Sequence, residues 1–169
     1  VDTIIITAAN AKYFDLVQGT ILSIRQKPQG KNAIIGFFDL GCTPDQVEWL
    51  QTQVNIIKQP HWEFNFSGKN KAPDYLKGLL ARPFLRRYFP NFDIYFWIDA
   101  DAWIQDWKAV DLFIKGAKKR GLAVVPEIDR GSHIQYGDLS GYWRTTYGWY
   151  KQAFGDEAAE KFYSYPMVN

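Results

Sequence analysis

The segment IYFWIDADAWIQD, residues 94–106, runs from an apolar stretch into three aspartates. Its first five residues are all apolar or aromatic, which is typical of a strand buried on both faces of a parallel sheet. Asp99 stands where this strand leaves the core. The segment therefore predicts a buried strand whose carboxyl end carries acidic side chains.

Asp99 and Asp101 are one residue apart at this strand end. If the backbone stays extended, both side chains project to the same side, because strand side chains alternate. Two carboxylates there repel each other unless a positive group binds between them. Mg²⁺ or Mn²⁺ prefers such oxygen ligands, and Mg²⁺ sites often add substrate phosphates. The pair predicts a divalent cation with a diphosphate ligand; the alternative is that Asp99 binds loop amides and Asp101 is a solvated turn residue.

The rest of the chain alternates apolar strands with amphipathic helices. Thr43, Pro44 and Gln46 form a strong helix start, Pro83 interrupts a helix at Arg82, and Asp106 is expected to cap the helix that follows it. Strands are predicted at 3–10, 33–40, 54–58, 94–98 and 121–127, and further helices near 12–26, 73–82, 140–154 and 156–163. This alternation predicts an α/β layered domain with a mostly parallel sheet, spanning 1–169 as a single domain. Such sheets bind ligands beyond the carboxyl ends of their strands.

The composition limits the classes of protein. The 169 residues are 47% hydrophobic, enough for one domain with a sizeable core. A net charge of +2 gives no sign of nucleic-acid binding. No apolar run approaches the roughly 18 residues of a membrane span. The single cysteine, Cys42, excludes an internal disulfide and suits a reducing compartment, so we predict a cytoplasmic location.

Two other strand ends carry candidate groups. The first strand ends in TAANAKY, which lacks the G-x-G-x-x-G loop of dinucleotide-binding proteins. Ala8, Ala9, Asn10 and Tyr13 could receive a base and ribose there, or the segment is an ordinary tight turn with Tyr13 in the core. Cys42 precedes a helix start, which could lower the pKa of its thiol; the alternative is a packing role.

Three segments together resemble the GT-A glycosyltransferases, and most closely the glycogenin-like and bacterial glycosyltransferase family 8 group. IIITAANAKYFDLVQGTILSIRQ (4–26) resembles the opening strand and helix of the family, and KGLLARPFLRRYFPNFDIYFWIDADAWI (77–104) resembles its basic helix and Asp-x-Asp metal motif. YPMVN (165–169) resembles the strand that runs into an Asn-Ala-Gly or Asn-Ser-Gly turn. The resemblance implies a Rossmann-like, three-layer nucleotide-diphospho-sugar transferase fold.

The resemblance also implies roles for individual residues. Asp99 and Asp101 would ligate a Mn²⁺ or Mg²⁺ that bridges the donor diphosphate. Lys77 or Arg82 matches the basic residue that faces the donor, and the helix break at Pro83 favours Arg82. The remaining implied contacts with the nucleotide sugar are Thr7, Ala8, Ala9, Asn10, Tyr13, Ala100 and, at the donor sugar, Asn169.

The implied activity is that of a metal-dependent glycosyltransferase of the hexosyltransferase class. Its donor is a nucleotide-diphosphate sugar, with UDP-sugar favoured over GDP-sugar, and its acceptor is an unidentified hydroxyl. The resemblance covers the donor-binding front of the family's domain, so we expect the acceptor part and a third metal ligand, a histidine, after residue 169.

Two other classes of protein stay open. One is a haloacid dehalogenase-type phosphatase with Asp99 as nucleophile, although Trp103 stands where that motif has Thr or Val. The other is a non-catalytic module in which Asp99 and Asp101 are structural and exposed aromatic side chains bind carbohydrate or a partner chain.

Overall fold

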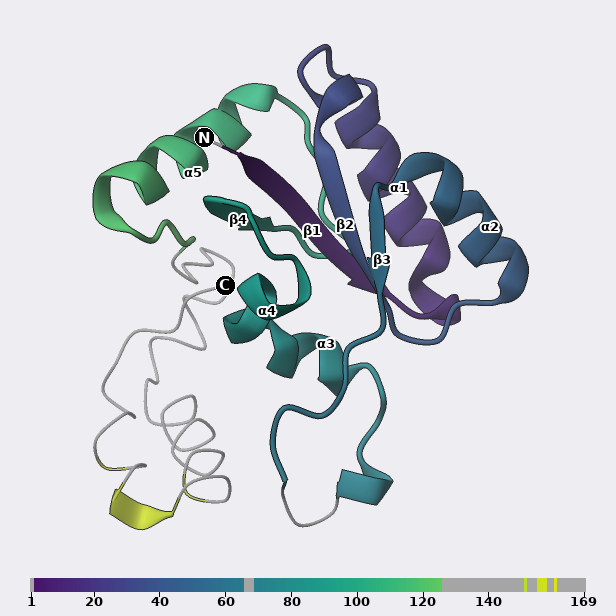
Figure 1. Ribbon diagram of the computed structural model, residues 1–169, viewed down its shortest axis with the longest axis vertical. Helices are drawn as coiled ribbons and strands as arrows, with labels where there is room; N and C mark the ends of the chain where they lie inside the picture. The colour runs from purple at the N-terminus through teal and green to yellow at the C-terminus, as the bar shows by residue number, and fades with distance from the viewer. Residues whose placement is uncertain (1, 66–68, 126–150, 152–154, 158–159, 161–169) are drawn as a thin grey trace, which may run out of the picture. The chain divides into compact units, whose positions relative to one another are not determined.

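The computed structural model describes residues 2–65, 69–125, 151, 155–157 and 160. The chain divides into two compact units, residues 1–122 and 123–169. The first unit carries the four strands of the described residues and the acidic segment after the last of them (Figure 1). Whether both units form the single domain expected from the sequence stays a prediction.

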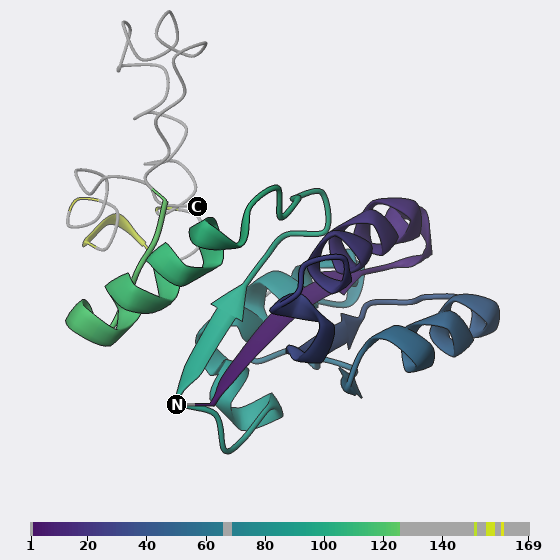
Figure 2. The same cartoon turned by 90° about the horizontal axis from the view of Figure 1, so that it is seen from above.

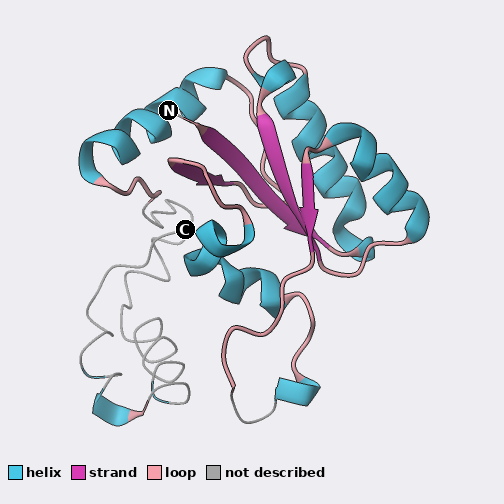
Figure 3. Ribbon diagram, in the orientation of Figure 1, coloured by secondary structure: helices cyan, strands magenta, loops and turns pink. Residues whose placement is uncertain are grey.

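A four-stranded parallel sheet forms the centre of the first unit (Figure 3). In chain order its strands are β1 (Thr3–Ala9), β2 (Ile34–Asp39), β3 (Ile56–Lys58) and β4 (Ile94–Trp97). Every neighbouring pair is parallel. The chain therefore has the predicted α/β fold with a Rossmann-like parallel sheet.

The order of the strands in this sheet is β3-β2-β1-β4. From β1 the chain moves outward through β2 to β3, and it then returns to the other side of β1 as β4. The strand order thus reverses between β1 and β4, which makes this place the topological switch point of the sheet. Ligands of open α/β sheets bind in the crevice outside the carboxyl ends of the strands at such a point.

Helices α2 (Pro44–Gln53) and α5 (Trp107–Arg120) begin where the sequence predicts, whereas α3 (Leu76–Ala81) begins three residues after the predicted start at residue 73. Thr43 caps α2 in a capping box with Gln46, and Asp106 caps α5 by accepting from the Lys108 amide at 2.9 Å. The helix before β4 breaks at Arg82, as expected from Pro83. The helices are α1 (Phe14–Arg25), α2 (Pro44–Gln53), α3 (Leu76–Ala81), α4 (Leu85–Tyr88) and α5 (Trp107–Arg120), with short 3₁₀ turns η1 (Ala11–Tyr13), η2 (Gly30–Asn32), η3 (Lys69–Lys71) and η4 (Arg82–Phe84).

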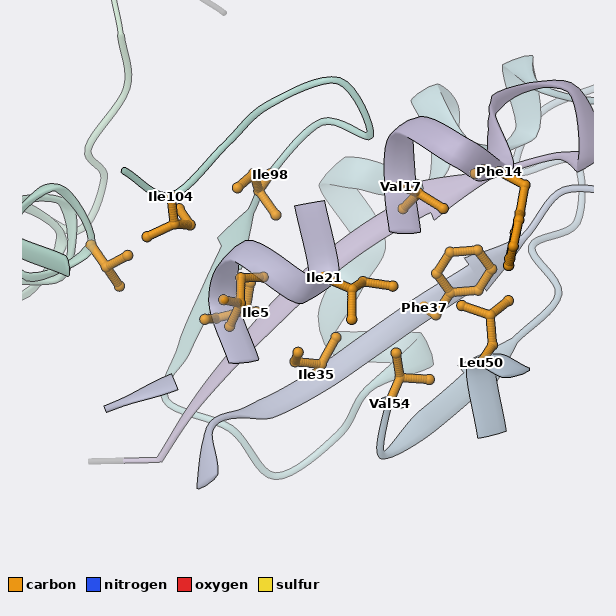
Figure 4. Close-up of a cluster of buried hydrophobic side chains, with 13 residues drawn as sticks. Ile5, Phe14, Val17, Ile21, Ile35, Phe37, Leu50, Val54, Ile98 and Ile104 are labelled. Carbon is orange, nitrogen blue, oxygen red and sulfur yellow. The ribbon is translucent and has the colours of Figure 1, made fainter. Parts of the chain in front are cut away.

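Buried side chains cover both faces of the sheet and give three layers. On one face α1, α2 and α5 contribute to a large cluster, and Figure 4 shows Val17 and Ile21 of α1 with Ile5, Ile35 and Phe37 of the sheet. On the other face the segment from α3 to α4 closes a second cluster, formed by Ile4, Ile6, Phe38, Ala81, Leu85 and Phe89. Figure 2 gives the view from above. This arrangement confirms the predicted layers.

Some details differ from the sequence-based expectations. The residues of β4 are half-buried rather than buried on both faces, because β4 lies at the edge of the described sheet. Tyr13, which one interpretation of the first strand end placed in the core, is 46% exposed. Residues 121–125 form no strand, and Gly121 ends α5 with a positive φ of 82°. Residues 126 and 127, and most of the two predicted closing helices, lie outside the described residues.

None of the described helices combines the length and the hydrophobicity that a bilayer span requires.

Candidate functional site

The carboxyl edge of the sheet brings the ends of β1, β2 and β4 together. Ala9 at the end of β1 lies opposite Asp39 at the end of β2. On the other side of β1, Ile98 continues the pairing one residue beyond β4, since its amide donates to the Ile6 carbonyl at 2.9 Å. Asp99 therefore emerges beside the last residues of β1, at the switch point.

The chain turns immediately after Asp99. The Ala102 amide donates to the Asp99 carbonyl at 3.0 Å, which closes a turn over Ala100 and Asp101. The expectation that Asp99 and Asp101 project to the same side depended on an extended backbone, and this condition is not met. Both aspartates stay at the strand end, but a turn rather than strand alternation sets their directions.

Helix α1 holds this turn through two buried hydroxyl groups. Thr20 Oγ1 lies 2.6 Å and 2.8 Å from the carbonyl oxygens of Ala100 and Ala102, and it can donate to one of them at a time. One helical turn further, Ser23 Oγ accepts from the Ile104 amide at 3.0 Å. Thr20 and Ser23 are both 1% exposed. The sequence analysis did not single them out, although polar residues on the inner side of an apolar helix are a usable signal.

Asp99 finds a positive partner within the protein. Its Oδ1 accepts from Arg82 Nη2 at 2.6 Å and from the indole Nε1 of Trp97 at 2.7 Å. The Arg82 guanidinium also lies over the Trp97 ring, with Cζ at 4.5 Å from the ring centroid. The pair is accessible, because the side chains of Arg82 and Asp99 are 33% and 38% exposed. Asp99 is thus compensated by Arg82, whereas the sequence argument required a bound cation for both carboxylates.

Asp101 differs from Asp99 in its surroundings. It is exposed, and among the described residues it has no hydrogen-bond or ion-pair partner. The two carboxylates of the motif are therefore unequal: Asp99 is anchored by two donors, and Asp101 is free to take a ligand.

The donor set partly fits a divalent cation. Asp101 and the second oxygen of Asp99 are hard oxygen donors, which suit Mg²⁺ and Mn²⁺ and are commonly completed by water and phosphate. Within residues 2–65, 69–125 and the few described positions beyond, no group of three or more His, Cys, Asp or Glu side chains could hold a metal. If a cation binds here, Asp99 and Asp101 would therefore supply only part of its ligands.

The end of β1 presents fewer groups than the sequence suggested. Thr7 is fully buried, and its Oγ1 has no hydrogen-bond partner among the described residues. Ala9 is also buried, at 3% exposed, and Ala8 packs against the second cluster. Asn10 Oδ1 caps η1 by accepting from the amides of Lys12 and Tyr13.

Tyr13 lies at the surface beside this turn. It is 46% exposed, and the Lys12 ammonium lies 5.8 Å from its ring centroid. The interpretation of Tyr13 as a core residue is therefore wrong. At this strand end Tyr13 is exposed and Ala8 and Asn10 are half-buried, so these three are the predicted contacts that a ligand can reach.

The structure separates the two basic candidates. Lys77 Nζ pairs with Asp74 Oδ1 at 2.8 Å and lies 5.6 Å from the Trp62 ring centroid, whereas Arg82 contacts Asp99. Of these two residues, Arg82 is the one at the acidic turn. Asn169 lies outside the described residues.

Asp39 is a carboxylate at the same edge that the sequence analysis missed. Burial raises its pKa, but hydrogen bonds from the amides of Cys42 and Gly41 and from Gln59 outweigh burial, so the pKa is lowered overall. It lines an open hollow of about 630 Å³ together with Cys42 and Glu48. The sequence pattern that singled out Asp99 also applies to Asp39, because Asp39 directly follows an apolar run.

The same surroundings decide the state of Cys42. Burial, the charge of Asp39 and a hydrogen bond with Asp39 raise the pKa of the Cys42 thiol to about 12. The interpretation of Cys42 as a thiol of lowered pKa is therefore wrong, and the group is a packing residue at neutral pH.

Comparisons with known proteins give little beyond this geometry. No protein-family model matches the sequence, and no curated protein matches it. Among solved structures, the crystal structure of S. aureus TarS 1–349 is similar with a TM-score of 0.38 and 15% sequence identity. The likeness covers 70% of this chain and 33% of that one, so the chain spans about a third of that structure's length. A likeness of this strength assigns neither a family nor an activity.

Proposed function

We propose that the chain is the donor-binding part of a metal-dependent glycosyltransferase. It would bind a nucleotide-diphosphate sugar, UDP-sugar in preference to GDP-sugar, and transfer the sugar to a hydroxyl acceptor. One observation carries the proposal: the acidic turn after β4 lies across the switch point from the accessible end of β1, with Arg82 directed at Asp99. An α/β sheet binds its ligand at this place.

The residues around the switch point would have separate roles in binding the donor. Asp101, with the free oxygen of Asp99, would hold a Mn²⁺ or Mg²⁺, which when bound supplies a Lewis acid that offsets charge on the departing diphosphate. Arg82 adds a positive charge fixed in place before the ligand arrives, and such preorganised charges stabilise developing negative charge without reorganisation. Asn10 and Tyr13 would receive the ribose and base.

The charges of the turn support metal dependence. Arg82 and Asp99 neutralise each other at 2.6 Å, so Asp101 leaves the turn with one net negative charge. A diphosphate brought to this turn alone would be repelled. A divalent cation reverses the sign of the interaction, because it is attracted both to Asp101 and to the phosphates.

Calorimetry of the full chain tests the proposal. We expect UDP to bind in the presence of Mn²⁺ and to bind at least about tenfold more weakly when EDTA is added. Asp101→Asn should weaken the Mn²⁺-dependent binding by a similar factor, because one ligand of the cation loses its charge. Asp106→Asn is the matched control, since the Asp106 carboxylate caps α5 by accepting from the Lys108 amide. Equal UDP affinity with and without Mn²⁺, or no effect of Asp101→Asn, would contradict the proposal.

Two further assays on the full chain distinguish the proposed glycosyltransferase from the phosphatase and from the non-catalytic module. Trapping of a phosphoenzyme analogue on Asp99 with fluoroberyllate would support the phosphatase instead. Glycan binding that EDTA leaves unchanged would support the non-catalytic module. A cytoplasmic location, inferred from the single cysteine, stays a prediction.

A further inference from the structure

Trp97 is the last residue of β4 and lies two residues before Asp99. Its indole is half-buried and belongs to the cluster that includes Phe38, whose ring centroid is 6.3 Å away. A core role would explain the ring. It does not explain the indole N–H, which is directed at the Asp99 carboxylate at 2.7 Å.

The contacts of Trp97 form a closed triangle with the ion pair. The indole N–H donates to Asp99 Oδ1, the face of the indole carries the Arg82 guanidinium at 4.5 Å, and Arg82 Nη2 donates to the same Oδ1. One rigid side chain therefore contacts both members of the pair. A cation over an indole face is attracted by the negative π-face of the ring.

Arg82 depends on this support. Among the described residues, its hydrogen bond to Asp99 is the only one shown for its guanidinium, and its buried Nε has no partner. A long side chain held at one point retains several rotamers, and their loss on binding opposes affinity. The stack on Trp97 provides a second point of attachment and removes that freedom before a ligand arrives.

We propose that Trp97 is a positioning residue that fixes Arg82 and Asp99 together at the switch point. The stack directs the guanidinium along the crevice, and the indole N–H holds one oxygen of Asp99 so that the other faces outward. Trp97 thus acts on a ligand through Arg82 and Asp99. The contact itself is independent of what binds there, whereas its consequence for affinity rests on the proposed function.

NMR of the full chain tests the contact without any ligand. The chain has seven tryptophans, and each gives its own indole N–H resonance. Trp97→Phe identifies the resonance of Trp97 by its disappearance. We expect this resonance to exchange slowly with solvent and to shift in Asp99→Asn and in Arg82→Lys, while the resonance of Trp49, which packs on Phe14, stays in place. If the indole proton of Trp97 exchanges rapidly with solvent and its chemical shift is unchanged in Asp99→Asn, the proposal is wrong.

Calorimetry then tests the consequence for binding. Trp97→Phe keeps a ring for packing and for the stack but removes the indole N–H. We expect it to weaken Mn²⁺-dependent UDP binding about tenfold, the size of one hydrogen bond to a charged group. The control Trp49→Phe should stay within about twofold of the wild type.

The outcomes separate the two proposals. If the wild type binds UDP and Trp97→Phe binds it equally well, the positioning role is wrong. If the wild type does not bind UDP at all, the proposed function fails, and the NMR shifts still decide whether Trp97 fixes the pair. Should Trp97→Phe unfold, through-bond assignment of the wild-type spectrum identifies the Trp97 resonance, and its shift in Asp99→Asn and Arg82→Lys provides the test on chains that keep the indole.

Discussion

The hydroxyl group of Thr20 is predicted to hold the turn at residues 99–102 in the conformation that binds the ligand. Thr20 is 1% exposed, and its Oγ1 lies 2.6, 2.8 and 3.2 Å from the carbonyl oxygens of Ala100, Ala102 and Leu16. Thr20→Val replaces the hydroxyl by a methyl group of similar size, so it leaves no cavity. It does remove the donor from the two carbonyl groups of the turn.

The size of the effect follows from the surroundings of these carbonyl groups. A buried acceptor that loses its donor costs about 1–3 kcal/mol. Ala100 and Ala102 are half-buried, so water can replace part of the lost interaction. We therefore expect Thr20→Val to lower the free energy of unfolding by about 1–2 kcal/mol. The ligand must also order a looser turn, so UDP affinity with Mn²⁺ should fall about three- to tenfold.

Urea unfolding and calorimetry measure the two effects. Thr20→Ser is the matched variant, because it loses a methyl group worth about 0.8 kcal/mol but keeps the hydroxyl. It should lose some stability and no affinity. Thr52→Val gives the baseline, since Thr52 is exposed and donates only within α2. If Thr20→Val binds UDP as tightly as Thr20→Ser, the hydroxyl does not hold the turn.

Three further predictions concern groups around the carboxyl edge. Because its pKa is raised to about 12, Cys42 should react with iodoacetamide at pH 8 roughly a thousandfold more slowly than free cysteine; labelling at the free rate would contradict this. Asp106→Ala should cost about 1 kcal/mol in urea unfolding as a lost helix cap, with Mn²⁺ and UDP binding unchanged, unlike Asp101→Asn. The lowered pKa of Asp39 stabilises the fold above the unfolded pKa of about 3.9, and this stabilisation is lost as pH falls through the lower folded pKa. Asp39→Asn should therefore cost stability at pH 7, with a cost that shrinks in strong acid; a cost independent of pH would refute the assignment.

The fold was predictable because its signals are local. The capping box at Thr43 and the break at Pro83 depend on residues within one helical turn, and both appear where expected. The strand expected at 121–127 was predicted from its apolar composition alone. The structure ends α5 at Gly121 and continues without a strand through residue 125.

The place of Asp99 at a strand end was predictable, whereas the geometry of the candidate site around it was not. The apolar run at residues 94–98 predicts a strand, and Asp99 is the first charged residue after it. The turn that follows depends on Thr20, a residue 80 positions earlier in the sequence. The pairing of Asp99 with Arg82 depends on how the segment from α3 to α4 packs on the sheet. Neither the contact of Thr20 with the turn nor that of Arg82 with Asp99 can be predicted from the residues next to Asp99 in the sequence.

Helix α1 explains why the two sides of the switch point keep a fixed relation. Its first turn follows directly on β1, through Asn10, which caps η1. Its middle holds the turn after β4, through Thr20 and Ser23. The ends of β1 and β4 are therefore tied to one rigid element as well as to each other in the sheet. A ligand that spans the crevice meets two edges whose spacing is set before it binds, so less of its binding free energy is spent on ordering the protein. The buried hydroxyl groups of α1 are thus part of the candidate site, although neither is expected to touch a ligand.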